Sequence, residues 1–296
     1  MLQNLIELFK GTMTITFSTC WYVFKAKFGT DVYEKWIDNM LSNVRNYYLV
    51  LYCDILGYEY VKKYYDNPRI KIVIKPFVDF YTYQHKKEWI RNHKNNWLLN
   101  EKVDWEVNAL WSEKINFVKE TIENKYFDTE FYGWMDIGYM RCRSNDLDTD
   151  SLVNWPSLSC VSKLDCNKIY YALVNNNDYY VHQLHSLVQD KNEFGLPKIP
   201  IPSNQVSVAG GFFICHRDIL PSWFKEYYEK LEKYFMYGYL VKDDQIVVAD
   251  CVFSKPEKFF LVKEDDSRYD NWFLFQRYLS QGNQLREPTV PLNPLP

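Results

Sequence analysis

"YYLVLYCD", residues 47–54, is an unbroken apolar run that ends in an acid. A run without polar alternation is typical of a strand that is buried on both faces of a parallel sheet. Before it, residues 12–19 alternate as a strand and residues 31–44 have the apolar spacing of a helix. After it come a short helix over 57–65 and a strand over 69–76. This β-α-β-α-β order predicts an α/β fold with a mainly parallel sheet.

Downstream of this core the predicted elements become shorter. Helices are expected over 83–98, 102–123, 178–188, 219–235, 242–253 and 268–279. Strands are expected over 131–136, 158–164, 168–174, 205–217 and 258–262. Asp218 is expected to cap the helix that follows it, with Pro221 in the first turn. The proline-spaced segment 196–204 is expected to be an ordered loop, and the proline-rich tail 281–296 to be flexible.

Composition excludes some classes of function. The net charge of −3 over 296 residues gives no broad field for a polyanion, so no nucleic-acid partner is expected. The basic segment 84–97 is interpreted as a solvated helix face. No apolar run approaches the ~18 residues that a membrane span needs. The seven cysteines include no CxxC pair, and we expect a soluble protein of the reducing cytoplasm.

The stretch "FYGWMDIGYMRCR", residues 131–143, is the first candidate site. Ligands of open α/β sheets lie beyond the carboxyl ends of the strands, where Asp54, Asp136 and the loop 18–22 would meet. A carboxylate accepts from hydroxyls and binds hard cations, so Asp136 is expected to meet a ribose hydroxyl or a divalent metal. Gly138 would let a bulky ligand approach the backbone. The alternative is an acid that caps a turn at the end of a strand.

Three cations accompany this acid. Lys114, Arg141 and Arg143 could neutralise a diphosphate, because charge-assisted hydrogen bonds to phosphate are strong. The alternative is that the arginines form salt bridges in solvent. The sequence alone leaves both interpretations open.

Two further motifs could belong to the same site. Gly210 and Gly211 interrupt a strand pattern, which marks either close contact with a ligand or a β-bulge. Asp243, Asp244 and Gln245 stand at a helix start, where they could cap the helix or act on a hydroxyl or an anomeric carbon.

Other reactive side chains give weaker signals. His182 and His185 are one helical turn apart, as metal ligands can be, but no third ligand stands at a typical spacing and we interpret them as surface histidines. No cysteine has a histidine partner in sequence that would make it a nucleophile.

Taken in order along the chain, these motifs resemble the bacterial HtrL/YibB-like proteins and, through them, glycosyltransferases of the GT-A fold. The resemblance covers roughly residues 12–279. The stretches that carry it are "TFSTCWY" (16–22), "YEKWIDNML" (33–41), "LYCD" (51–54), "LWSEKINFV" (110–118), "WMDIGYMR" (134–141), "AGGFF" (209–213) and "DDQIV" (243–247).

The resemblance implies a nucleotide-sugar-dependent glycosyltransferase with one GT-A-like domain over residues 1–280. Its Rossmann-like half, about 12–140, would bind the nucleotide sugar, and a smaller mixed-sheet half, about 141–280, would bind the acceptor and catalyse transfer. The residues that it assigns to the nucleotide sugar are Ser18, Thr19, Trp21, Tyr22, Lys114, Asp136, Gly138, Arg141, Gly210 and Gly211.

The resemblance also places Asp243, Asp244 and Gln245 beside the reacting carbon, and Asp136 at either the first or the last acid of the metal-binding DxD motif. The chain reads Asp136-Ile137-Gly138, so an Asp is absent from the third place and the chain departs from the motif. We still expect Mn²⁺ or Mg²⁺ at Asp136, although Lys114 and Arg141 could replace it electrostatically.

For stereochemistry, Asp244 would be the base of an inverting enzyme, whereas Gln245 or Asp244 could lie beneath the anomeric carbon of a retaining one. The "DDQ" motif resembles the DQD-type arrangement of retaining enzymes, and this resemblance implies retention. The expected donor is a UDP-hexose and the expected acceptor a glycan or protein. The alternative is a non-catalytic carbohydrate-binding or scaffold protein with a degenerate GT-A fold.

Overall fold

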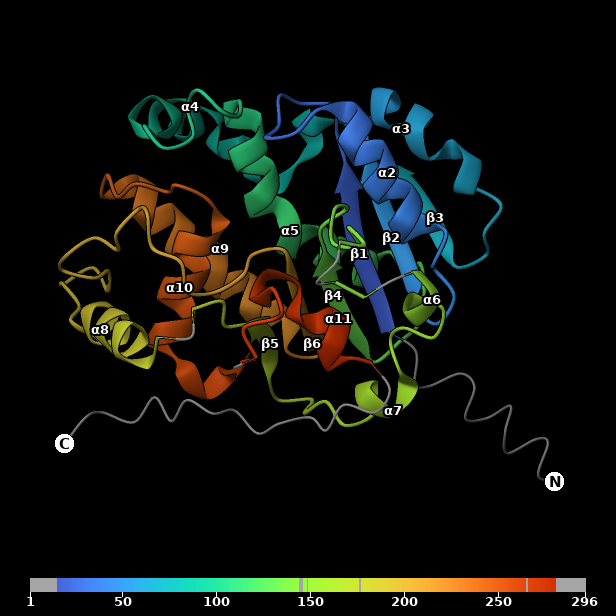
Figure 1. Cartoon of the computed structure of the whole chain (residues 1–296). Helices are drawn as coiled ribbons and strands as arrows, with labels where there is room; N and C mark the ends of the chain where they lie inside the picture. The colour runs from blue at the N-terminus through green and yellow to red at the C-terminus, as the bar shows by residue number, and fades with distance from the viewer. Residues whose placement is uncertain (1–14, 144–145, 148, 176, 265, 281–296) are drawn as a thin grey trace.

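A seven-stranded sheet runs through the centre of the computed structural model, which describes residues 15–280 except 144–145, 148, 176 and 265 (Figure 1). The strand order is β3-β2-β1-β4-β6-β5-β7, and within the described residues only β6 runs antiparallel to its neighbours. The strands are β1 (Ile15–Trp21), β2 (Tyr48–Cys53), β3 (Ile70–Ile74), β4 (Phe131–Met135), β5 (Ile169–Ala172), β6 (Phe212–His216) and β7 (Phe259–Val262). The predicted α/β class with a mainly parallel sheet in one domain is confirmed.

Helices cover both faces of the sheet (Figure 1). The first face packs against α4 (Lys86–Asn95), α5 (Trp105–Glu123), α8 (Asp178–Gln189), α9 (Leu220–Met236) and α10 (Asp244–Ser254). The second packs against α2 (Thr30–Leu41), α3 (Ile55–Val61), α6 (Thr149–Leu152), α7 (Leu158–Val161) and α11 (Leu274–Tyr278). Short 3₁₀ turns span Lys62–Tyr64, Phe77–Asp79, Tyr81–His85, Pro256–Lys258 and Asn271–Phe273.

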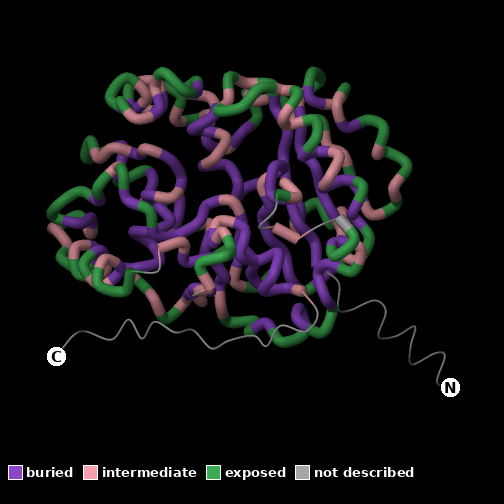
Figure 2. Tube along the Cα trace, in the orientation of Figure 1, coloured by how far each residue is buried: buried purple, intermediate pink, exposed green. Residues whose placement is uncertain are grey.

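The burial of β2 on both faces explains the unbroken apolar run at 47–54. Residues 49–53 of β2 are all buried, because β2 lies between β1 and β3 and has helices on both faces (Figure 2). Successive side chains of β1 point to opposite faces of the sheet and so pack into the hydrophobic clusters on both faces. Phe17 stacks on Trp155 on one side of the sheet, whereas on the other side the hydroxyl of Ser18 shares a hydrogen bond of 2.8 Å with Thr121 of α5.

The antiparallel direction of β6 determines the position of Gly210 and Gly211. Parallel strands β1, β2 and β4 all end at one edge of the sheet, and β6 begins at that same edge. Gly210 and Gly211 precede β6, so they lie beside the end of β4, where the amide of Asp136 donates to the carbonyl of Gly211 at 2.9 Å. The fold therefore brings the two predicted site motifs together.

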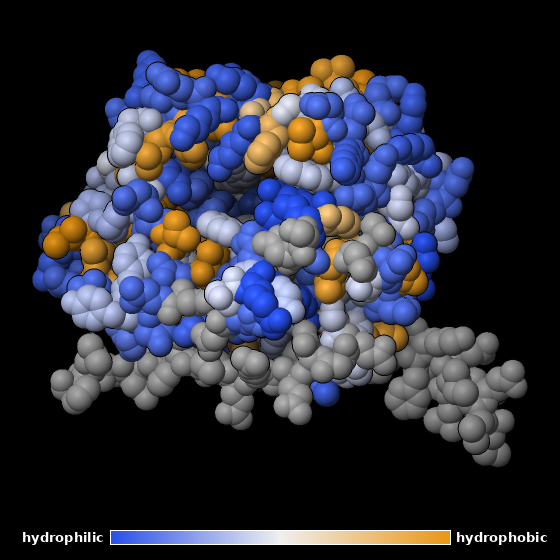
Figure 3. Space-filling view, in the orientation of Figure 1, coloured by the Kyte–Doolittle hydropathy of each residue, from blue (hydrophilic) through white to orange (hydrophobic). Residues whose placement is uncertain are grey.

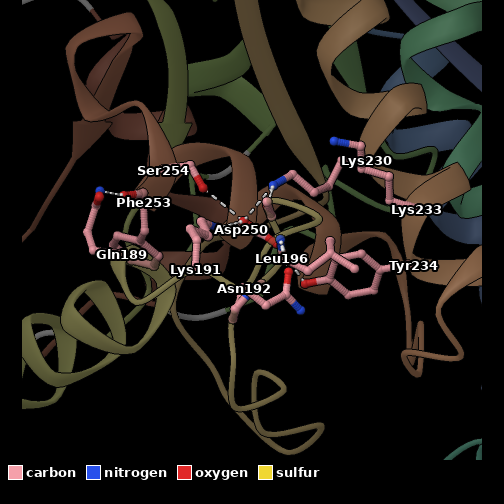
Figure 4. A network of polar contacts seen from close by, with 12 residues as sticks. Gln189, Lys191, Asn192, Leu196, Lys230, Lys233, Tyr234, Asp250, Phe253 and Ser254 are labelled. Carbon is pink, nitrogen blue, oxygen red and sulfur yellow. Dashed lines mark hydrogen bonds and ion pairs between the residues drawn. The ribbon is translucent and has the colours of Figure 1, made fainter.

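A buried carboxylate anchors α10 (Figure 4). Asp250 accepts hydrogen bonds from Lys191 Nζ at 2.5 Å, Lys230 Nζ at 3.0 Å, Tyr234 Oη at 3.0 Å and Ser254 Oγ at 2.8 Å. These donors come from α9, α10 and the segment after α8. The network fixes α10 against its neighbours and thereby positions the acids at the start of this helix.

Several element predictions need correction. Residues 158–164 contain the helix α7 rather than a strand, because Cys160, Val161 and Leu164 are buried at the spacing of a helix face. The strand predicted over 205–217 begins at Phe212, since the glycines before it weaken a strand and only Val208 forms an isolated bridge.

At the helix ends, Asp218 does not cap α9, whose N-cap is Ile219, while Pro221 occupies the first turn as predicted. The segment predicted as a helix over 268–279 contains a 3₁₀ turn followed by the short helix α11. Residues 12–14 of the first predicted strand and the predicted tail 281–296 lie outside the described residues.

Among the helices of the described residues, none combines the length and the apolar character that a membrane span requires. Cys20, Cys53, Cys160, Cys166, Cys215 and Cys251 are free thiols. The predicted cytoplasmic location stays a prediction.

Candidate functional site

A cavity of about 390 Å³ opens at the carboxyl edge of the sheet. Its charged lining residues are Lys27, Lys114, Arg141, Arg143, Asp136, Asp243, Asp244 and Asp270. The other lining residues are Phe28, Tyr33, Trp111, Gly138, Tyr139, Gly211, Gln245, Trp272 and Phe273. Figure 3 shows this orientation of the molecule hollowed near its centre, with hydrophilic residues gathered around the hollow.

Lys114 lies at the bottom of this cavity and joins three segments of the chain. Its Nζ lies 3.2 Å from Asp136 Oδ1, 3.1 Å from Asp244 Oδ2 and 2.8 Å from the carbonyl oxygen of Gly210. The side chain of Lys114 is 7% exposed and that of Asp244 6%, whereas that of Asp136 is 42% exposed. Trp134 Nε1 also donates to Asp136 Oδ1 at 2.6 Å. Asp136 is therefore the member of the cluster that a ligand can reach.

Burial and charge shift the pKa values of this cluster. Burial raises the pKa of the Asp244 carboxyl to about 7, because the opposing effect of Lys114 is only partial and the nearby acids Asp243 and Asp136 add to the rise. Burial alone would lower the pKa of Lys114, but the carboxylates of Asp136 and Asp244 outweigh it and the pKa of Lys114 is raised. Lys114 is thus a fixed cation, while Asp244 can exchange a proton near neutral pH.

The first residues of α10 form one wall of the cavity. Asp243 occupies the N-cap position, but its side chain makes no capping hydrogen bond and pairs with Lys242 at 2.9 Å. Its Oδ1 is buried and has no hydrogen-bond partner among the described residues. Asp244 and Gln245 follow in the first turn, and both line the cavity. The side chain of Asp243 therefore does not cap α10, although the residue stands at the N-cap position.

The two glycines before β6 leave room for the carboxylates. A Cβ on Gly210 would lie 2.8 Å from Asp244 Oδ2, and one on Gly211 would lie 3.2 Å from Asp136 Oδ2. Gly138 has a different role, because a Cβ there would lie 2.8 Å from the ring of Trp36. The group that lies close to the backbone of Gly138 is thus the ring of Trp36, a part of the protein itself.

A second, smaller cleft of about 110 Å³ joins the cavity. The two share Tyr33, Trp111, Asp136, Gly138 and Arg141. The remaining lining of the cleft is mostly apolar: Cys20, Trp21, Tyr22, Phe24, Ala26, Val107, Leu110, Trp134 and Ile137. The predicted residues Trp21 and Tyr22 therefore lie where a flat ring could be held.

The two predicted arginines differ in their partners. Arg143 pairs with Asp146 at 3.0 Å and with Asp270 at 2.9 Å. Arg141 donates from Nε to the carbonyl of Gly138 at 2.9 Å, and its guanidinium lies 4.1 Å from the ring centroid of Trp36. Within the described part of the chain no carboxylate forms an ion pair with Arg141, so its guanidinium is available to an anion in the cavity.

A comparison with protein families matches residues 59–279 to the model of HtrL_YibB, described as a bacterial protein of unknown function. The chain belongs to the HtrL_YibB family. The family resemblance read from the sequence is thereby confirmed, whereas the relation to GT-A glycosyltransferases stays a prediction.

Comparisons with other proteins add little to this assignment. No curated protein matches the chain. One solved structure to which the chain is similar is 4-diphosphocytidyl-2C-methyl-D-erythritol synthase from Anaerococcus prevotii, at 13% identity and a TM-score of 0.37. The match covers 90% of this chain and 96% of that chain. A likeness this distant says nothing about the function of this HtrL_YibB protein.

Three predicted site residues lie elsewhere in the structure. Ser18 and Thr19 are fully buried within β1 and line neither the cavity nor the cleft. They are interior strand residues because β1 continues to Trp21, two residues beyond the end that the sequence suggested. Asp54 caps α3 by accepting from the amide of Gly57 at 2.6 Å.

The sequence reasoning missed other residues of the site. Lys27 lies with its Nζ 5.1 Å from the ring centroid of Trp111, and both line the cavity. Trp272 and Asp270 reach it from the segment before α11. Trp111 carried a usable signal, since it stands three residues before Lys114 and shares its helix face. Lys27 lies in an irregular segment, and Asp270 and Trp272 lie at a 3₁₀ turn within the stretch predicted as a helix over 268–279, where no motif marked them as site residues.

The donor set does not match the expected metal site. Within residues 15–280, apart from the gaps stated above, no group of three or more His, Cys, Asp or Glu side chains could hold a metal ion. The ammonium of Lys114 already contacts one oxygen of Asp136 and one of Asp244. Hard divalent cations take six or more oxygen ligands, most of which would have to come from outside this cluster.

The other candidate residues remain apart from the cavity. His182 and His185 lie on α8, and burial together with His182 lowers the pKa of His185. Cys20 borders the cleft, but burial and the charge of Asp136 raise the pKa of its thiol far above its ordinary value. A thiol of that kind stays protonated and is a poor nucleophile.

Proposed function

We propose that this protein is a glycosyltransferase that moves a sugar, from a UDP-hexose, to a hydroxyl group of a glycan or protein acceptor. The observation that carries the proposal is the union of an aromatic cleft with a charged cavity at the Asp136–Lys114–Asp244 cluster. A nucleotide sugar has the same sequence of parts: a flat base, a hydroxylated ribose, an anionic diphosphate and a hydroxylated sugar.

The nucleoside would occupy the aromatic cleft. Trp21 and Tyr22 line it from the end of β1, and Trp111 closes it from α5. Aromatic faces of this kind hold planar rings. Asp136 lies at the junction of cleft and cavity with a half-exposed carboxylate, which suits it to accept hydrogen bonds from ribose hydroxyls.

The diphosphate would lie against Arg141. Its guanidinium borders both spaces, is packed on the ring of Trp36, and has no competing carboxylate among the described residues. A planar guanidinium binds phosphate through two hydrogen bonds at once. Lys27, across the cavity beside Trp111, would add a second positive charge.

The donor sugar would then meet Gly211, Asp244 and Gln245. In the transfer, the bond between the anomeric carbon and the diphosphate oxygen breaks, and its electron pair leaves with the diphosphate. The acceptor oxygen forms the new bond to that carbon. We propose retention, in which the acceptor proton passes to the departing diphosphate oxygen while Gln245 and ionised Asp244 stabilise the positive charge at the anomeric carbon.

Turnover of nucleotide sugars tests this function. The purified protein is incubated with UDP-, GDP- and TDP-sugars, with and without oligosaccharide acceptors, and the released nucleotide is measured. We expect UDP release that rises with acceptor, and a product whose anomeric configuration, measured by NMR, equals that of the donor.

Two variants separate catalysis from folding. Asp244→Asn removes the buried carboxylate of the cavity, and Asp190→Asn changes an acid on the surface that pairs with Lys198 at 2.7 Å. We expect the first to lose about 100-fold in turnover or more, as removal of an electrostatic contact to a transition state does, and the second to retain full turnover. Binding of UDP without turnover of any donor would favour the non-catalytic scaffold, and absence of both would refute the proposal.

A further inference from the structure

We propose that the ammonium group of Lys114 is the resident cation of this cavity, and that the site neither binds nor requires a divalent metal. The inference deepens the proposed function, because it leaves the charge of the departing diphosphate to the cations of the cavity wall instead of a metal ion. Its first part, the exclusion of metal, rests only on the contacts of the cluster and can be tested without any knowledge of the reaction.

Three oxygen atoms surround the ammonium group of Lys114, one through a hydrogen bond and two through ion pairs. An ammonium group has three N–H donors and no acceptor. Lys114 Nζ has three oxygen neighbours, on Asp136, Asp244 and the carbonyl of Gly210, at 3.2, 3.1 and 2.8 Å. These oxygens come from the end of β4, the start of α10 and the turn before β6. The cation is therefore held by three separate segments, as a bound metal ion would be.

The same contacts leave a divalent ion without a coordination shell. Asp136 Oδ1 is shared between Lys114 and the indole N–H of Trp134, which donates to it at 2.6 Å. Asp244 Oδ2 also faces Lys114, and Asp244 is almost fully buried. An ion between these two carboxylates would have to lie close to the ammonium, where like charges repel strongly in a partly buried site.

Charge balance points the same way. The ammonium of Lys114 lies 3.2 Å from one carboxylate and 3.1 Å from the other, so a positive charge already stands between the two acids. Asp136 and Asp244 together with Lys114 leave one net negative charge when both acids are ionised. Arg141 and Lys27 at the cavity wall supply the positive charge that a diphosphate needs.

Titration with Mn²⁺, followed by the EPR signal of the free ion, tests the exclusion of metal. We expect the wild-type protein to bind no Mn²⁺ at the cluster, so that Asp136→Asn leaves the titration unchanged. Lys114→Ala removes the ammonium and frees both carboxylates. This variant should bind Mn²⁺ at concentrations at which the wild type leaves the signal of the free ion unchanged, because the like charge is gone.

The matched control is Lys119→Ala. Lys119 lies on the same helix, but pairs with Glu123 at 2.6 Å outside the cavity. Its replacement should leave Mn²⁺ binding as in the wild type. If Lys114→Ala does not fold, as circular dichroism would show, the wild-type and Asp136→Asn titrations still decide. Tight Mn²⁺ binding by the wild type that Asp136→Asn abolishes would overturn the proposal.

The catalytic part has its own readout. With a donor that turns over, the rate in EDTA should equal the rate in Mn²⁺ or Mg²⁺, and a rate that requires the metal would overturn this part. If no donor turns over, the proposed function fails while the Mn²⁺ titration still tests the exclusion of metal. The two failures are therefore distinguishable.

Discussion

Replacing Gly210 with alanine would place a methyl group against the most tightly held carboxylate of the cavity. The new Cβ would lie 2.8 Å from Asp244 Oδ2, 3.1 Å from Oδ1 and 2.8 Å from Gln245 Cγ. Ordinary van der Waals contact begins near 3.4 Å, so Asp244 or the backbone must move by about 0.6 Å. Asp244 is buried and paired with Lys114, which leaves little room for that movement.

The expected cost is that of overpacking a rigid interior, about 1–3 kcal/mol of unfolding free energy. The assay is thermal or urea denaturation followed by circular dichroism, with turnover of the nucleotide sugar measured in parallel. We expect a lower melting temperature and a loss of turnover together, because the movement displaces both Asp244 and its contact with Lys114.

Gly211→Ala is the matched comparison. Its Cβ would lie 3.2 Å from Asp136 Oδ2, and the side chain of Asp136 is 42% exposed and can give way. We therefore expect a smaller loss of stability from this substitution than from Gly210→Ala. Equal stability of Gly210→Ala and the wild type, with normal turnover, would refute the packing described between the glycine turn and α10.

Three other predictions concern groups around the site. Burial raises the pKa of Glu113 to about 7 from 4.5, so the folded state holds an extra proton between those values and stability should fall as the pH rises through them, by on the order of 3 kcal/mol. Glu113→Gln should remove that part of the slope in urea titrations at several pH values, and an unchanged slope would contradict the assignment. Arg141→Met should weaken UDP binding, measured by calorimetry, by about ten- to a hundredfold, through loss of a charge-assisted contact, and unaltered affinity would place the diphosphate elsewhere. Asp250→Asn should lower the free energy of unfolding by about 3 kcal/mol, because Lys191 and Lys230 lose their shared partner, and a change below ~0.5 kcal/mol in denaturant titrations would show that the network contributes little.

The sequence predicted the fold where each strand is buried on both faces. The run 47–54 could only be a central strand, and the alternation with helices fixed the parallel order of β1, β2 and β3. The sequence-based prediction was wrong at 158–164. A short apolar segment there fits a helical turn as well as a strand, and its length does not distinguish the two.

The sequence predicted those parts of the candidate site that depend on the order of the strands. Asp136, Gly211 and Asp244 stand at element ends, which topology brings to one edge, so their nearness could be inferred. Ser18 and Thr19 stand at the end of the strand predicted over 12–19, but β1 continues to Trp21, so both side chains are buried inside the strand and line neither the cavity nor the cleft. The direct contact of Lys114 with two acids could not be predicted, because it depends on how α5 is placed across the sheet.

A crystal structure from crystals grown with UDP and Mn²⁺ tests most directly the claim that the cavity binds a nucleotide sugar and that Lys114 takes the place of a metal ion. We expect the uracil ring in the cleft beside Trp21 and Tyr22, the diphosphate against Arg141, and Lys114 still bound to its three oxygens with no metal between Asp136 and Asp244. UDP bound outside this cavity, or no UDP at saturating concentration, would contradict the account of the site. A Mn²⁺ ion between the two carboxylates would contradict the role given to Lys114.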